Sequence, residues 1–212
     1  MNFRLIDETI PGTKLKKEDI GGLTGKAFLR QIFFVSDGVM LSQIRKISGI
    51  DGSTLQNWTK RGWVANSHSK RYNMDQVAHI FLINMLRSCM QLNHIAWLIE
   101  YINGDVEDSS DDIITETDLY DLICNVLEAL AKRESCTMDT IRDAANALLV
   151  DYDAPVEGAK ERLINALEII VVSYYASLIK QYADGKLRVL TGKAAEESTE
   201  EESTEEETTE EE

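Results

Sequence analysis

The sequence predicts an all-α protein with one small β element. Apolar residues recur three and four positions apart through most of the 212 residues, which is the spacing of one face of a helix. Asp, Ser or Asn can cap several of these segments, and Gly ends some of them, as is common at helix ends. With 43% apolar residues, 12 Gly and 2 Pro, the composition suits one or two globular domains and argues against a fibrous or wholly disordered chain.

The first regular elements are two short helices across a tight turn. Residues 1–25 are expected to form an irregular arm, with a short helix beginning near Thr24. Apolar residues at helical spacing then predict a helix over 41–47, which the pair Ser48-Gly49 breaks. The next helix follows at once.

This second helix has recognisable ends. Asp51 or Ser53 can cap its N-terminus, and Leu55 and Trp58 form its buried face. Gly62 ends it, because a residue without a side chain readily adopts the left-handed conformation at a helix C-terminus. Two short helices across a turn that contains Gly are typical of a helix-turn-helix unit.

A polar stretch with apolar ends, residues 65–72, predicts a small β-hairpin or wing after the second helix. Asn73 can then cap a third helix, which carries a broad apolar stripe as far as Leu86. Gln91 opens a fourth helix that ends at Asn103. We therefore expect one compact domain that includes these four helices.

The second half of the chain is expected to be a separate helical domain. An acidic linker, residues 103–115, precedes it. Its three helices are predicted over 116–131, 138–149 and 156–183, within a domain of residues 116–190. Residues 191–212 contain repeated Glu-rich units without large apolar side chains after Leu190, and we expect them to be a disordered acidic tail.

Charge is distributed unevenly, although the net charge of the chain is −15. Residues 26–102 contain nine basic and four acidic side chains, whereas residues 103–155 contain 14 acidic and three basic ones. The segment 194–212 adds 11 Glu and no basic residue. This asymmetry indicates separate roles for the segments, with any polyanionic partner on the basic first half.

Several functional classes lack support in the sequence. No run approaches 18 apolar residues and no secretory signal is recognisable, so we expect a cytoplasmic protein without a membrane span. The cysteines, Cys89, Cys124 and Cys136, are odd in number and widely spaced, which predicts reduced thiols. The common phosphate-binding and nucleophile motifs are absent, so we expect no enzyme, no cofactor and no metal site.

The stretch from Ile44 to Ile99 resembles the DNA-binding head of the mercury-resistance-regulator (MerR) family. That head has a Gly-Val/Ile turn, a Thr-Leu-x-x-Tyr/Trp helix closed by Gly, a wing that ends in an Arg/Tyr pair, and two further helices. The matching residues are Gly49, Ile50, Thr54, Leu55, Trp58, Gly62, Tyr72, Leu92 and Ile95. The resemblance implies a MerR-like winged helix-turn-helix over residues 26–102 and double-stranded DNA as the partner.

The whole chain also resembles an uncharacterised bacterial family described as a domain of unknown function, through the phrases TLQNWTKRGWV and IEYINGD. Compared with MerR heads, this chain has Gln56 where Arg is common and Cys89 where Gly is usual, and its wing is shorter. A helical domain also replaces the long coiled coil that follows the MerR head. The sensing residues of that family therefore do not transfer to this chain.

The second helix and the wing supply the expected DNA-binding residues. Those on the helix lie away from its buried face, where Gln and Asn can pair with adenine and Lys and Arg can contact phosphate or guanine. The candidates are Ser53, Thr54, Gln56, Asn57, Lys60 and Arg61 on the helix, and Lys70, Arg71 and Tyr72 on the wing. Transcription regulation is the expected function, with the second domain serving assembly or effector sensing.

Two further expectations concern partners. The alternative function is a non-enzymatic protein-interaction module that keeps the winged scaffold without DNA readout and docks a basic partner on its acidic part. The long helix over 156–183 also has apolar side chains on more than one face, so we expect a homodimer. The residues that suggest it are Ile169, Ile170, Val171, Val172, Tyr174 and Tyr175.

Overall fold

The computed structural model describes residues 8–34, 36–104, 112–133 and 136–191, and these are mostly helical. The tail that we expected to be disordered lies outside the described residues from residue 192 onward, as does 105–111 within the expected acidic linker. All structural statements below concern the described part of the chain.

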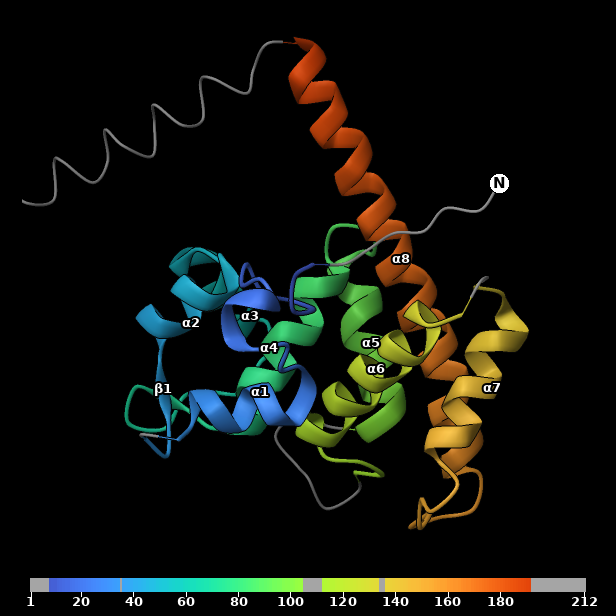
Figure 1. The fold of residues 1–212 in the computed structure, drawn as a ribbon. Helices are drawn as coiled ribbons and strands as arrows, with labels where there is room; N and C mark the ends of the chain where they lie inside the picture. Colours follow the sequence, from blue (N-terminus) through green and yellow to red (C-terminus); the bar gives the residue numbers. More distant parts are fainter. Residues whose placement is uncertain (1–7, 35, 105–111, 134–135, 192–212) are drawn as a thin grey trace, which may run out of the picture.

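The described elements follow one another along the chain as short helices, two minimal strands and one long final helix (Figure 1). They are the 3-10 helix η1 (Glu18–Ile20), α1 (Gly25–Ile32), β1 (Val39–Met40), α2 (Leu41–Ser48), α3 (Gly52–Lys60), β2 (Arg71–Tyr72), α4 (Met74–Leu86), α5 (Leu92–Asn103), α6 (Glu116–Ala131), α7 (Met138–Leu148) and α8 (Ala159–Thr191). This order confirms the mostly helical class.

Helix ends with clear capping signals match the sequence predictions. The Asp51 side chain accepts a hydrogen bond from the backbone N–H of Thr54, and Asn73 caps α4 with a reciprocal bond to Gln76. α6 has the predicted bounds, and α7 ends one residue before the predicted end. α8 differs: it begins three residues late and continues to Thr191, eight residues past the predicted end.

In place of the predicted hairpin, the described residues 65–72 contain one tight turn, closed by a bridge between His68 and Arg71. β2 pairs in antiparallel register with β1, so that Tyr72 lies opposite Val39 and Arg71 opposite Met40. Val39 and Tyr72 are both buried, whereas residues 65–70 offer no large apolar side chain to cover Tyr72. The need to bury this ring explains why the chain pairs with a distant strand.

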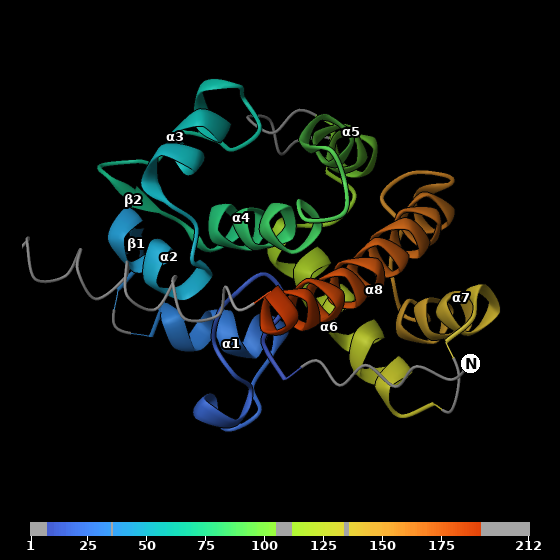
Figure 2. The same ribbon diagram turned by 90° about the horizontal axis from the view of Figure 1, so that it is seen from above.

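α4 lies at the centre of the fold, surrounded by other helices (Figure 2). It packs against α5, α6 and α8, and also against α2. Phe81 of α4 stacks on Phe28 of α1 at 6.2 Å between ring centroids and lies 6.0 Å from the ring of Tyr120 on α6. The expected first domain, 26–102, and the expected helical domain, 116–190, therefore share one hydrophobic core.

The described part of the N-terminal segment contains η1 and an isolated bridge between Thr9 and Lys16, and its residues Ile10 to Gly12 are packed between the two halves of the chain. Ile10 is fully buried, and the hydroxyl of Tyr120 donates a hydrogen bond to the carbonyl oxygen of Pro11 (2.7 Å). The side-chain amide of Asn84 donates to the carbonyls of both Gly12 (2.9 Å) and Ser48 (3.0 Å). One α4 side chain thus joins the N-terminal segment to the end of α2.

α8 combines a packed first half with an apolar composition. By length and composition alone it could cross a membrane, because an 18-residue window has a mean hydropathy of 1.5. Less than half of that window is buried in the fold, at 44%. The buried side chains of α8, from Ala159 to Ser177, pack it against α4, α5, α6 and α7.

A glycine at position 12 is required by close backbone packing. Its φ of +78° is unfavourable for other residues, and an added Cβ would overlap the carbonyl group of Phe81. Gly158 has almost the same φ, +80°, but nothing lies within 4 Å of its Cβ position. The two glycines share the backbone conformation and differ in the space around it.

We expect Gly12→Ala to destabilise the protein much more than Gly158→Ala. The second change carries only the left-handed backbone penalty, about 1–2 kcal/mol. The first adds overpacking against α4, which typically costs about 1–3 kcal/mol more. Urea unfolding of both variants measures the difference, and equal losses would contradict the close approach of residue 12 to α4.

Candidate nucleic-acid interface and the adjoining cavity

A tight turn fixes α3 against α2. Gly49 ends α2 with φ +72°, and its N–H donates to the carbonyl oxygen of Arg45 (2.8 Å). Ile50 is buried beneath the turn, and Asp51 caps α3. Three residues, 49–51, thus separate the two helices.

α3 has two distinct faces. Leu55 and Trp58 are buried in the core, as predicted, and fix the orientation of the helix. The opposite face carries four exposed polar residues at positions i, i+3, i+4 and i+7. These residues, which we call the α3 polar face, are Ser53, Gln56, Asn57 and Lys60.

Two of the predicted DNA-contact residues, Ser53 and Thr54, form hydrogen bonds to the residue that caps α3. The hydroxyls of Ser53 and Thr54 both donate hydrogen bonds to the carboxylate of Asp51, at 2.5 and 2.6 Å. These bonds, with the backbone N–H of Thr54, hold the pKa of the Asp51 carboxyl far below its usual range. A permanent negative charge therefore lies at the N-terminus of α3, where a phosphate would otherwise be favoured.

The tip of the short turn after α3 is basic. His68 and Arg71 form a bridge with two backbone hydrogen bonds of 3.0 and 2.9 Å. Ser69 and Lys70 between them both have positive φ, 51° and 62°, as in the two-residue turns that suit a β-hairpin. Lys70 is exposed at this tip, as expected of a wing residue.

Arg71 and Tyr72 have structural roles that the sequence did not reveal. The guanidinium of Arg71 donates from Nη1 to the hydroxyl of Ser36 (3.0 Å) and the carbonyl of Gly38 (2.8 Å). Tyr72, expected at the DNA surface, is only 8% exposed and belongs to the core. Its ring completes the apolar pair with Val39, so it offers almost no surface to a partner.

Other cationic side chains lie near α3. Arg61, a predicted contact, places its guanidinium 5.1 Å from the ring centre of Trp63. Arg87, which follows α4, lies 5.8 Å from the ring centre of Trp58 of α3. No local sequence signal identifies Arg87, because it lies 29 residues from Trp58 and only the folded chain brings the two together.

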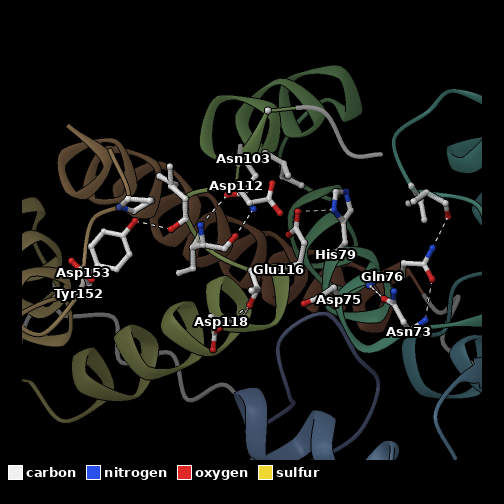
Figure 3. Close-up of a pocket in the computed structure, with 18 residues that line it drawn as sticks. Asn73, Asp75, Gln76, His79, Asn103, Asp112, Glu116, Asp118, Tyr152 and Asp153 are labelled. Atoms are coloured by element: carbon white, nitrogen blue, oxygen red, sulfur yellow. Dashed lines mark hydrogen bonds and ion pairs between the residues drawn. The ribbon is translucent and has the colours of Figure 1, made fainter. Parts of the chain in front are cut away.

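A cavity of about 830 Å³ lies beside this region, between α4, the end of α5, residues 112–118 and residues 152–155 (Figure 3). Its labelled lining is strongly acidic. The carboxylates come from Asp75, Asp112, Glu116, Asp118 and Asp153. In the described ranges, no three His, Cys, Asp or Glu side chains are arranged to hold a metal ion.

The first turn of α6 is held to α4 at one wall of the cavity. His79 Nδ1 lies 3.1 Å from Glu116 Oε1, and these side chains are 6% and 14% exposed. One turn earlier on α4, Asp75 accepts hydrogen bonds from the backbone N–H (2.9 Å) and hydroxyl (2.6 Å) of Thr117. We call these two contacts the α4–α6 clamp, of which Figure 3 shows the one between His79 and Glu116.

The cavity wall also reaches the loop before the basic turn. The side-chain amide of Gln76 donates to the carbonyl oxygens of Ala65 (3.3 Å) and Asn66 (2.8 Å). On the other side, Asn103 bonds to the backbone of Ile114, at 2.7 Å through Nδ2. The cavity therefore connects the loop that follows α3 with the start of α6.

Comparison with known proteins supports the resemblance to a domain of unknown function. Residues 26–123 match the family model of DUF1836, a domain of unknown function. The chain is also 23% identical over 104 residues to the uncharacterized protein YkrK of Bacillus subtilis (strain 168), over 47% of this chain and 45% of that protein. This chain thus spans less than half of that relative. No solved structure matched.

The matched segment differs in extent from the expected first domain, 26–102. It begins in α1 and runs through the first half of α6, past the expected linker. This is the part of α6 that contacts Asp75 and His79 of α4. The family model thus spans both sides of the α4–α6 clamp, and these matches do not extend to the MerR family.

We expect Asp75→Ala to destabilise the fold by about 1–3 kcal/mol, because the buried Thr117 loses its acceptor. Asp75→Asn keeps an acceptor oxygen while removing the same charge from the first turn of α4. The difference between the two variants in chemical unfolding therefore reports the hydrogen bonds alone. Equal stability of both variants would show that the hydrogen bonds from Thr117 to Asp75 contribute nothing.

Proposed function

We propose that this protein binds double-stranded DNA through α3 and the basic 68–71 turn and acts in transcription regulation. The observation that carries this proposal is the α3 polar face, which points away from a well-packed core. An α-helix with its side chains is about 10–12 Å across, which suits the width of a major groove, about 12 Å. In this proposal the fold of the first half is a winged helix-turn-helix of MerR-like type.

The middle of the α3 polar face would read bases. Gln56 and Asn57 are exposed side by side, and each amide can pair with adenine through two hydrogen bonds. Ser53 and Thr54 bond to Asp51, so they contribute less than the sequence suggested. Base recognition by α3 would therefore rest mainly on the side-chain amides of Gln56 and Asn57.

Phosphate contacts would lie away from the N-terminus of α3, because the Asp51 carboxylate repels phosphate there. The C-terminal end carries Lys60 and Arg61, and the turn adds Lys70. Exposed Arg45 and Lys46 of α2 supply further positive charge. Such contacts position a protein on DNA without reading its sequence.

A second candidate function is protein interaction, and one observation favours it. On α5, Trp97 is 59% exposed and stacks on Tyr101 with 5.5 Å between ring centroids. Exposed aromatic side chains are common at the centre of protein interfaces. In this alternative the scaffold does not read DNA, and the acidic middle of the chain, residues 103–155, binds a basic partner.

Selection of bound fragments from a random DNA pool, followed by salt titration of the selected sequence, tests the proposal. Enrichment of one sequence supports regulation by specific binding. If the protein retains no DNA at low salt, where phosphate contacts are strongest, the DNA-binding proposal is wrong and the protein-interaction alternative is favoured.

We expect Gln56→Ala and Asn57→Ala each to relax preference at one or two base pairs and to cost about 1–3 kcal/mol on the selected site. Gln181→Ala, an equally exposed amide on α8, is the matched control and should bind as the parent does. The measurement is the ratio of affinities for selected and scrambled DNA. Uniform weakening on both DNAs would contradict direct readout.

We expect Lys60→Gln combined with Lys70→Gln to weaken binding to every sequence and to reduce the slope of log K against log salt by about 2. Arg71 is left unchanged, because its bonds to Ser36 and Gly38 hold the turn. Lys180→Gln combined with Lys186→Gln on α8 removes the same charge elsewhere. If both pairs change the slope equally, only net charge matters and the two predicted contacts are wrong.

A further inference from the structure

The C-terminal half of α8 projects beyond the rest of the fold (Figure 1). Upstream, Leu163 and Leu167 are fully buried, and burial on this helix ends with Ser177. From Ile179 to Thr191 the residues are exposed, apart from a half-buried Asp184. Because these residues are exposed, packing within the described fold does not account for apolar side chains here.

A continuous apolar stripe nevertheless runs along the outer face of α8 into the projecting part. Its large side chains are between 43% (Val172) and 84% (Leu190) exposed. All of its members fall within one narrow face of the helix, opposite the buried face. These residues, called the α8 stripe, are Ile169, Val172, Ala176, Ile179, Ala183, Leu187 and Leu190.

The stripe has a defined beginning. On the same helical face one to two turns upstream, the side chains are polar, and Arg142 of α7 crosses them. Arg142 bonds to Glu168 (2.7 Å), Glu161 (3.0 Å) and Asn165 (3.1 Å). The available apolar surface therefore runs only from Ile169 to the end of the helix.

We propose that the α8 stripe is covered by the α8 stripe of a second copy of this chain, in antiparallel orientation. Spacings of three and four residues are those of a helix that packs along another helix, and the two alanines allow close approach. Of the six residues that suggested a dimer from sequence, only Ile169 and Val172 belong to the stripe. Ile170, Val171 and Tyr174 are buried in the core, and Tyr175 is half-buried.

The order of side chains along the stripe fits an antiparallel pair. About a twofold axis near Ile179, Ile169 faces Leu190, Val172 faces Leu187, and Ala176 faces Ala183. Large side chains then meet large ones, and the small ones meet near the axis. An antiparallel pair also opposes the two helix dipoles and places the two bodies at opposite ends.

The size of the stripe agrees with a dimer interface. It runs from Ile169 to Leu190, which is about 30 Å of helix, so a second copy can pack along its whole length. This surface is larger than the single exposed apolar residues of ordinary protein surfaces. A second copy supplies a matching stripe of the same length.

A membrane is the competing partner, because α8 has the composition of a span. The projecting part contains Lys180, Asp184, Lys186 and Arg188, and Lys180 forms an ion pair with Asp184 at 2.5 Å. A span over this part would place four charged residues in hydrocarbon, which is costly. In an antiparallel helix pair all four remain at the solvent side of the stripe or at its edges.

The first test is sedimentation of the full chain at tens of micromolar, with Leu187→Glu and Val189→Glu as a matched pair. Both positions are exposed and apolar, but Val189 lies off the stripe, and neither change should affect folding. We expect a dimer for the parent and for Val189→Glu, and at least tenfold weaker association for Leu187→Glu. A monomeric parent, or equal effects of both variants, would overturn the proposal.

The second test is disulfide cross-linking in a background with the exposed thiols removed by Cys89→Ser and Cys136→Ser. Ala176→Cys mixed with Ala183→Cys should form a mixed disulfide more readily than either variant forms one alone, and the reverse result would overturn the antiparallel arrangement.

Flotation with anionic phospholipid vesicles is the third measurement. Vesicle binding by a monomer that Leu187→Glu abolishes would assign the stripe to a membrane. These readouts do not involve DNA, so they stand or fall separately from the proposed function.

Discussion

The fold depends on the burial of α4, of whose 13 residues nine are buried. A helix covered to this extent leaves few side chains in open water, so the polar groups along it bond to other parts of the protein. Asp75 and His79 contact the first turn of α6, and Asn84 joins the N-terminal segment to α2. The orientation of α3, and with it the candidate DNA-binding surface, therefore depends on elements from both ends of the chain.

Much of the secondary structure could be predicted because its signals are local. Asp51, Asn73 and Gly49 determine helix ends through bonds to neighbours a few residues away. The end of α8 was missed because Asp184-Gly185 resembles a stop signal, yet the helix continues through this pair for another turn and a half. The strand pair and the shared core were also missed, since a partner more than 30 residues away leaves no periodic signal in either segment.

The candidate site shows the same division between local and distant causes. The α3 polar face followed from the 3.6-residue period and the two buried residues opposite it. The hydrogen bonds from Ser53 and Thr54 to Asp51 are local, and the sequence Asp-Gly-Ser-Thr could have predicted them. The burial of Tyr72 required knowledge of Val39, and the approach of Arg87 to Trp58 required the packing of α4, so neither could be inferred from spacing.

The place of the N-terminal segment has a consequence for the order in which the chain can fold during synthesis. Residues Ile10 to Gly12 leave the ribosome before their partners on α4 and α6, including Asn84 and Tyr120, which emerge more than 70 residues later. Contacts this distant in sequence form late, and until then the apolar surface of α4 has no cover. We expect nascent chains that stop before α6 to remain open and to need protection from aggregation, so the segments from Ile10 to α6 fold together only once α6 has been synthesised.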